Sequence, residues 1–278
     1  MSEFELTRDN YYSNEANKLY WSNSQYKDFL ACSARAKAMV DGDYIVDLSD
    51  NASVQKGVYV DERIEIGDDE ELLEEWKREH PEFYKKNGGL YANLQVAEKG
   101  YQRVMQDELF KSFVTGCTYQ DVRTFELVDG IEFKCKFDCL FDDKIVDIKT
   151  TNPRSYYDGV WSDEKGFKEN FILAYGYDIQ GALYQEAEYQ RTGIRKPFYI
   201  AVVVLPSNTN DAIDFNVIHV DDAILYNALQ GVKENIQTFD LIKNGFLAPQ
   251  RCEECDYCIE TKKLDRVQEL SELIEGIL

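Results

Sequence analysis

Residues 131–151 read IEFKCKFDCLFDDKIVDIKTT, and this stretch predicts the centre of the fold. From residue 131 to 141, apolar side chains occupy the odd positions and charged side chains most of the even ones, which is typical of a half-buried strand. A polar turn follows at residues 142–143. Residues 145–149 alternate again, with Asp147 and Lys149 on the same face. The stretch therefore predicts two strands joined by a tight turn.

The length of the turn predicts the register of this hairpin. A two-residue loop at 142–143 places Asp138 opposite Asp147. It also places Lys136 opposite Lys149. Directly opposed like charges destabilise a strand pair, whereas a divalent cation between two carboxylates stabilises it, because hard cations prefer oxygen ligands. The pattern favours a metal site with a lysine beside it, and the alternative is a solvated hairpin of mixed charge.

The rest of the chain predicts an α/β fold, with a mixed central sheet and helices on its faces. Hydrophobic periodicity and capping residues indicate helices at residues 25–40, 68–79, 90–114, 171–191 and 221–244. Apolar runs indicate further strands at residues 119–128, 197–205 and 215–220. Residues 152–170 are expected to form a long loop rich in aromatic and charged side chains.

The chain of 278 residues is long enough for one large domain. We expect an extended N-terminal arm at residues 1–20 and a single domain at residues 21–278. Within that domain we expect a helical part at 21–114, a catalytic core at 115–248 and a cysteine-rich segment at 249–278 that includes a final short helix.

Composition restricts the compartment and the class of protein. No run of apolar residues is long enough to cross a membrane. The polar N-terminus is unlike a signal peptide, and the odd number of cysteines, seven, indicates a reducing compartment, so a cytoplasmic protein is expected. The net charge of −21 argues against a broad nucleic-acid-binding surface but leaves room for a local basic channel.

A second pair of polar residues lies in the helix predicted after the long loop. Gln180 and Tyr184 are four residues apart, so their side chains share one face of the helix. An amide there can hold a phosphate or a water molecule, and a phenol can contact a nucleic-acid backbone. The alternative is that both side chains lie on a solvated helix face.

The order Asp138, Asp147-x-Lys149 and Gln180-x-x-x-Tyr184 resembles the PD-(D/E)XK nuclease superfamily. The segments SNSQYKDFLAC, GVYVD, YDIQGALYQE and RCEECDYC extend the resemblance, from residue 20 to 262, to RecB- and RecE-like phage or prophage exonucleases of the exodeoxyribonuclease VIII type. The resemblance implies a restriction-endonuclease-like core. It also implies an Mg²⁺-dependent (Mn²⁺ as substitute) 5′-to-3′ exonuclease on double-stranded DNA, in a bacterial host cell. Its 3′ single-stranded tails would go to a phage single-strand annealing protein, and the subunits would form a ring-shaped trimer or tetramer.

The resemblance also implies roles for individual residues. The family has a further ligand upstream, often in Gly-x-x-x-His; here Gly57-x-x-x-Asp61 points to Asp61, with Glu62 or Glu65 as alternatives. The expected metal ligands are Asp61, Asp138, Asp147 and the backbone carbonyl of Ile148. Lys149 would act on the phosphate or the water, and Gln180 and Tyr184 would position the strand. Residues expected to contact DNA are Lys134, Lys136 and Arg154. The competing hypothesis is a non-catalytic binding or assembly module on the same fold.

The cysteines predict a second site. Cys252, Cys255 and Cys258 are spaced closely enough to reach one metal, and Cys32 is the candidate for a fourth ligand. Some relatives in the superfamily hold a [4Fe–4S] cluster with one N-terminal and three C-terminal cysteines, although with a wider final spacing. The sequence leaves a [4Fe–4S] cluster, Zn²⁺ and free thiols open. The other three cysteines, Cys117, Cys135 and Cys139, are expected in the core.

Overall fold

The computed structural model describes residues 4–162, 165–208, 210–264, 266–267 and 269–270. Its centre is a mixed five-stranded sheet in the order β1-β2-β3-β6-β7. These strands are β1 (Thr118–Val128), β2 (Ile131–Leu140), β3 (Ile145–Thr151), β6 (Phe198–Val204) and β7 (Asp214–Val220). Strands β3 and β6 are parallel and the other neighbours are antiparallel. The predicted α/β class with a mixed sheet is confirmed.

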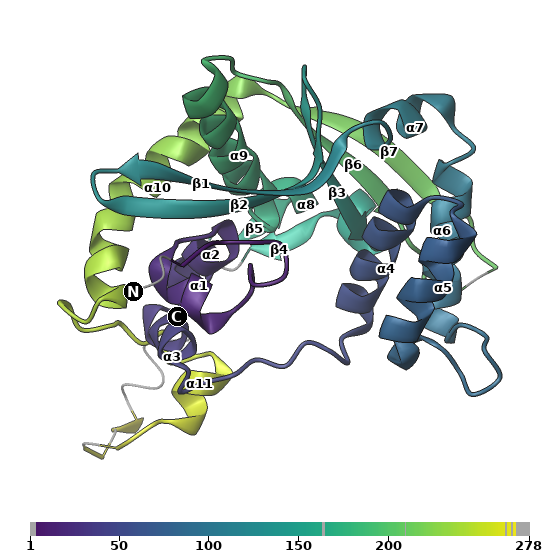
Figure 1. The fold of residues 1–278 in the computed structure, drawn as a ribbon. Coiled ribbons are helices and arrows are strands. Elements are labelled where there is room, and N and C mark those ends of the chain that lie inside the picture. The colour runs from purple at the N-terminus through teal and green to yellow at the C-terminus, as the bar shows by residue number, and fades with distance from the viewer. Residues whose placement is uncertain (1–3, 163–164, 209, 265, 268, 271–278) are drawn as a thin grey trace.

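Helices cover both faces of this sheet (Figure 1). The helices packed on one face are α2 (Asn23–Ala31), α3 (Ser33–Asp41), α9 (Tyr177–Thr192) and α10 (Asp222–Lys243). The helices on the other face are α4 (Ala52–Ile66), α5 (Glu70–Glu79), α6 (Ala92–Val104) and α7 (Glu108–Val114). Strand β6 contributes alternate side chains to the two clusters, as its continuous apolar run predicts.

The alternation of β2 is interrupted at Asp138. The odd residues from Ile131 to Phe137 pack on the α9 face, but Cys139 packs on the α4 face. Across the ladder, Gln120 of β1 has a φ of 50°, a left-handed conformation that is uncommon for a residue other than glycine. The two strands are thus both irregular where Asp138 lies, and such irregularities gather at functional sites.

The N-terminal residues are not an extended arm. They contain α1 (Asn14–Leu19), and they cover Lys134 of β2, whose ammonium donates to the Tyr11 carbonyl and to Asn17 Oδ1. Beside β2, the backbone N–H of Trp21 donates to the Glu132 carbonyl at 2.8 Å, and the N–H of Lys134 donates to the Trp21 carbonyl at 2.7 Å, so Trp21 extends the sheet locally. With Lys134 covered, β2 is buried on both faces for most of its length rather than half-buried.

Three predicted helices are each divided into two. Cys32 is extended, with φ −163°, and separates α2 from α3. The N-cap Asp107 begins α7 after a break that follows α6. Gly176, at φ 64°, separates α8 (Phe171–Ala174) from α9. In each case one to three residues change the chain direction inside an otherwise continuous hydrophobic period, which the period alone does not reveal.

Two further segments differ from prediction. Helix α4 was not predicted, because Gly57 interrupts its apolar residues. The expected loop at residues 152–170 contains the short π-helix η2 (Arg154–Asp158) and a two-stranded sheet of β4 (Val160–Ser162) and β5 (Phe167–Glu169). The remaining short elements are the 3₁₀ helix η1 (Pro81–Phe83) and α11 (Asp256–Glu260).

The C-terminal tail returns to the N-terminal helices, where α11 lies beside α3 (Figure 1). The predicted final short helix, in so far as it falls on residues 271–278, lies outside the described residues. Among the helices of the described part, none combines the length and apolar character needed to span a bilayer.

Candidate active site

Strands β2 and β3 separate at Asp138 and Asp147. The predicted register is confirmed for the pairs Cys139–Val146 and Leu140–Ile145, and the ladder then ends. Instead of pairing with Asp147 through the backbone, Asp138 inserts its side chain, and its Oδ2 accepts the Ile148 N–H at 3.0 Å. The carboxylate of Asp138 therefore takes the place of a strand carbonyl.

The predicted pairing of Lys136 with Lys149 is consequently wrong, because the strands have already diverged. The carbonyl of Lys136 instead accepts a hydrogen bond from the Tyr184 hydroxyl at 2.6 Å. The opposition of two ammonium groups is thereby avoided, while the two carboxylates remain in the gap between the strands.

A single lysine contacts both aspartates. The Lys149 Nζ lies 2.5 Å from Asp147 Oδ2 and 3.8 Å from Asp138 Oδ2. Asp147 has no exposed surface, and the side chain of Lys149 is 18% exposed. The Lys149 Nζ also donates to the Ile148 carbonyl at 3.2 Å. The structure thus brings the predicted Asp–Asp–Lys set together on one side of the sheet.

The electrostatics of this set follow from its burial. Desolvation raises the pKa of Asp147 to about 8; Lys149 opposes this shift and Asp138 adds to it. For Lys149, desolvation favours the neutral amine, but attraction by Asp147 and Asp138 outweighs it and raises the pKa. The lysine is therefore protonated at neutral pH, and the ionised form of Asp147 depends on the positive charge beside it.

Helix α9 supplies the next contacts through Gln180 and Tyr184. The Gln180 amide donates to Asp147 Oδ1 at 2.7 Å and to the Tyr184 hydroxyl at 3.0 Å. Tyr184 is only 6% exposed. Both side chains therefore point at the β2–β3 gap rather than at solvent, so the alternative of a solvated helix face does not hold.

Of the three upstream acids, Asp61 of α4 is the one that lines the site cavity. Desolvation and the nearby Asp138 raise the pKa of Asp61 well above its ordinary value. Glu62 and Glu65 face the N-terminal segment instead, where Arg8 contacts Glu65 at 2.6 Å and Glu62 at 3.7 Å. The helix thus directs neighbouring acids to different partners.

The cavity in front of these residues has a volume of about 310 Å³. Its lining includes residues that the sequence reasoning did not assign to the site: Tyr11, Tyr12, Ser22, Asn23, Ser24, Lys27 and Tyr177. The Lys27 Nζ donates to the Tyr175 carbonyl at 2.9 Å, and it lies 5.7 Å from the ring centroid of Tyr177, whose other neighbour is Lys149 at 5.2 Å. Lys27 belongs to the segment SNSQYKDFLAC, so the resemblance was the signal that could have identified it.

The three residues expected to contact DNA lie in different environments. Lys134 is 2% exposed, and its ammonium donates to Asn17 Oδ1 at 2.8 Å and to the Tyr11 carbonyl, beneath the N-terminal segment. Lys136 is half-buried and lines the cavity. Arg154 is exposed on η2 and is not among the described residues that line the cavity.

The acidic residues fit a divalent cation. Asp147 Oδ2 is buried and, within the described part of the chain, accepts no hydrogen bond, so the lysine ion pair is its polar contact. A carboxylate oxygen of this kind, beside a second carboxylate, is a suitable donor for Mg²⁺ or Mn²⁺. Asp61, Asp138 and Asp147 do not form one close group of ligand atoms, since the group of three or more found among the described residues is made of thiols.

That set is the predicted group of cysteines. The sulfur atoms of Cys32, Cys252, Cys255 and Cys258 all lie within 4.8 Å of one another and could hold a metal ion. The remaining three cysteines belong to the core: Cys135 and Cys139 are buried, and Cys117 is half-buried against it.

Comparison with known proteins gives a consistent picture. Residues 22–261 match the family model of a PDDEXK-like domain of unknown function (DUF3799). No curated protein matches the chain. Among solved structures, the crystal structure of a protein named "Putative exonuclease" from Eubacterium rectale is 34% identical, with a TM-score of 0.85, over 99% of this chain and 100% of that chain.

These matches support a nuclease. The family match spans Asp61, Asp138, Asp147, Lys149, Gln180 and Tyr184. Because it covers most of the chain, and because the structural match has the same fold, this chain belongs to the PDDEXK-like family DUF3799 of the PD-(D/E)XK nuclease superfamily.

Proposed function

We propose that this protein is a metal-dependent exonuclease that degrades linear double-stranded DNA, in the 5′-to-3′ direction. The observation that carries the proposal is the position of Lys149, whose ammonium contacts both Asp138 and Asp147 at the floor of a cavity. Two acids that share one lysine at a gap between strands suit phosphodiester hydrolysis better than they suit structural stability, since burying two carboxylates beside a single ammonium is costly.

Asp138, Asp147, Asp61 and the Ile148 carbonyl would hold Mg²⁺, with Mn²⁺ as a substitute. When bound, such an ion supplies Lewis-acid catalysis to phosphodiester hydrolysis. Before binding, the raised pKa of Asp147 means that this carboxyl must release its proton, so occupancy is expected to increase with pH.

Lys149 is proposed to stabilise the transition state. Because its pKa is raised, it remains an ammonium and does not act as a general base. It can donate a hydrogen bond to a phosphate oxygen or to the attacking water, and its charge offsets the negative charge that builds on phosphorus. The acids on either side orient its Nζ toward the cavity.

Gln180 and Tyr184 are proposed to position these groups. The Gln180 amide occupies one oxygen of Asp147, which leaves the other oxygen directed at Lys149. The Tyr184 hydroxyl donates to the Lys136 carbonyl and accepts from Gln180, so it connects β2 with α9. Their role would be to hold the aspartate in one orientation while DNA enters.

DNA would approach through local positive charge, since the chain as a whole is acidic. Lys27, Lys136 and Lys149 all line the cavity, where their ammonium groups can contact phosphates. The proposal includes the 3′ single-stranded tail as product, a phage-type single-strand annealing protein as its recipient, and a ring-shaped trimer or tetramer that encircles DNA.

The proposal is tested with linear duplex DNA labelled at either the 5′ or the 3′ end, in Mg²⁺. We expect early loss of the 5′ label, resistance of covalently closed circles, and complete inhibition by EDTA. Asp147→Asn and Lys149→Ala are expected to lower the rate at least ~1000-fold, because each removes charge from the reaction centre.

Asp143→Asn is the matched control, because this aspartate lies in the same hairpin with a side chain that is 78% exposed. Its rate should equal that of the wild type. Activity that survives both active-site substitutions would reject the assigned residues. If the wild type binds DNA but cleaves none under any metal condition, the protein is a binding module and the nuclease proposal is wrong.

A further inference from the structure

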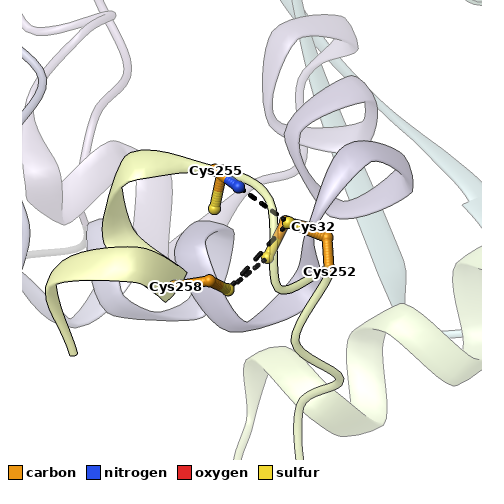
Figure 2. Close-up of side chains that lie close together, drawn as sticks. All are labelled: Cys32, Cys252, Cys255 and Cys258. Carbon is orange, nitrogen blue, oxygen red and sulfur yellow. Dashed lines mark hydrogen bonds between the residues drawn. The ribbon is translucent and has the colours of Figure 1, made fainter. Parts of the chain in front are cut away.

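Four cysteines, one near the N-terminus and three near the C-terminus, lie close together outside the lining of the site cavity. We call Cys32, Cys252, Cys255 and Cys258 the four-cysteine cluster. Figure 2 shows their sulfur atoms directed toward one another, with Cys32 at the junction of α2 and α3 and the others on the C-terminal tail. The sulfur of Cys258 lies 3.6 Å from that of Cys32 and 3.9 Å from that of Cys252.

These separations discriminate between kinds of metal centre. A single Zn²⁺ has four Zn–S bonds of about 2.3 Å in a tetrahedron, which places the sulfur atoms about 3.8 Å apart. A [4Fe–4S] cluster binds each thiolate at a different iron atom, so its thiolates must lie considerably farther apart. The observed distances, all within 4.8 Å, fit a single ion and are too short for the cluster.

Backbone N–H groups favour negative charge on two of the sulfurs. Cys32 is the N-cap of α3, and its sulfur accepts the Arg35 N–H at 3.5 Å, where the helix dipole also favours an anion. The Cys252 sulfur accepts the Cys255 N–H at 3.3 Å.

The closeness of the four sulfur atoms itself favours a cation. All four lie within 4.8 Å of one another, so any negative charge on them is concentrated in one small volume. Four thiolates cannot share so small a volume unless a cation offsets their charge, because each ionised sulfur opposes ionisation of the next. The arrangement is therefore complementary to a divalent ion.

The tail depends on this cluster for its position. From residue 246 to 264 nearly every side chain is at least partly exposed, and Cys258 is the fully buried exception. Outside the cluster, the tail is held to α3 by short backbone contacts of Gln250, whose carbonyl accepts the Ala34 N–H at 2.9 Å and whose N–H donates to Ser33 Oγ at 2.8 Å. A segment with so little apolar burial needs another source of stability.

We propose that the four-cysteine cluster binds one Zn²⁺ tetrahedrally and fastens the C-terminal tail to the α2–α3 junction. Cys32 is also the C-cap of α2, and the same helix carries Asn23 and Ser24 at its opposite end and Lys27 in its middle, all of which line the site cavity. The zinc site thus fixes the helix that forms one wall of that cavity. This inference does not depend on the proposed nuclease activity.

The test is the metal content of the full-length protein, produced in medium that contains both zinc and iron and purified without oxygen. We expect about one zinc atom per chain, no iron, and no visible absorption near ~400 nm. Iron accompanied by that absorption would replace the zinc site with an iron–sulfur cluster and overturn the inference. Absence of both metals, with no zinc uptake on titration, would overturn it as well.

Cys252→Ser removes one ligand at a half-exposed position, and Cys117→Ser, a half-buried cysteine outside the cluster, is its control. We expect Cys252→Ser to retain less than about a tenth of the zinc and to be cleaved faster by trypsin after Arg251, whereas Cys117→Ser should match the wild type. In the Co²⁺-substituted wild type, we expect the absorption bands of tetrahedral thiolate ligation. Equal zinc content in both variants would reject the assigned ligands.

Discussion

Gln180 shows how one neutral side chain can orient a buried acid of the candidate site. Its amide contacts Asp147 and Tyr184 together, so it connects α9 to the strand that carries Asp147. An amide in this place does not add to the negative charge of the acids, whereas a glutamate would. Its contribution is therefore expected in the rate of cleavage rather than in stability.

We predict that Gln180→Ala lowers the single-turnover cleavage rate roughly 10- to 100-fold, because Asp147 loses the donor that orients it. The melting temperature should change by only a few degrees, since a hydrogen bond of this kind contributes about 1 kcal/mol. Gln190→Ala on the same helix is the control, because its amide contacts the Glu126 carbonyl and Glu186. A full rate in Gln180→Ala would show that the contact has no catalytic role.

Lys243 is a buried lysine whose protonation affects stability. Its ammonium donates to the Tyr20 carbonyl at 2.9 Å and to Gln25 Oε1 at 3.0 Å, and desolvation lowers its pKa to about 7. In the unfolded chain the lysine pKa is about 10.4. Between these values the unfolded chain binds more protons than the folded one, so the free energy of unfolding increases with pH.

We therefore predict that the wild type gains about 1–2 kcal/mol of unfolding free energy relative to Lys243→Met between pH 7 and pH 9. The measurement is urea unfolding of both proteins at each pH. Other titrating groups are common to the two proteins and cancel in the difference. The same pH dependence in both would mean that Lys243 keeps an ordinary pKa in the folded state.

At the scale of elements, the approach of α9 to the sheet depends on one glycine. A Cβ at Gly181 would lie 2.4 Å from the ring of Phe198 in β6, and that ring is fully buried. The same helix carries Gln180 on the adjacent position, so the distance between helix and sheet also determines whether the amide reaches Asp147. Gly181 therefore affects the position of Gln180 through the packing of α9 on β6.

We predict that Gly181→Ala destabilises the fold by about 1–3 kcal/mol, because the methyl group forces the helix away from β6. Gly231→Ala, in α10, has open space around its Cβ and should be neutral or stabilising by up to about 1 kcal/mol. Thermal unfolding of the two variants measures the contrast. If both behave alike, the close approach of helix and strand is not as tight as described.

Most elements could be predicted from hydrophobic periodicity, and their failures have a common cause. The five strands of the central sheet and α10 were located to within about two residues, because their patterns are long and regular. The breaks at Cys32, Asp107 and Gly176 were missed, because a hydrophobic period continues through a change of direction when both halves pack on the same core. Helix α4 was missed because Gly57 interrupts its hydrophobic pattern; the helix forms nevertheless, since it packs against the sheet and α6.

At the scale of the whole molecule, the N-terminal segment is part of the fold. It covers the buried ammonium of Lys134, more than one hundred residues away in the sequence. Tyr11 is 8% exposed there, and the adjacent Tyr12 is 71% exposed. The two tyrosines make a matched pair for testing how much the segment contributes.

We predict that Tyr11→Ala lowers the free energy of unfolding by about 3 kcal/mol, because it leaves a cavity next to Lys134. Tyr12→Ala should change it by less than about 1 kcal/mol. Chemical denaturation of both variants provides the comparison. Equal small effects would indicate that the segment is a detachable arm, as the absence of periodicity in residues 1–20 predicts.

The sequence by itself determined the type of fold, the register of the first hairpin pairs and the grouping of Asp138, Asp147 and Lys149. These follow from local spacing, since alternation and turn length act between near neighbours. Gln180 and Tyr184 were assigned to the site through the family resemblance of the sequence. Only the tertiary structure decided that β2 and β3 separate at Asp138 and that Asp61 rather than Glu62 faces the cavity. It also decided that four thiols from both ends of the chain lie at single-ion distances. Each of these depends on contacts between segments that are distant in the sequence. The burial and charge interactions of such contacts produce no periodic pattern in the sequence itself.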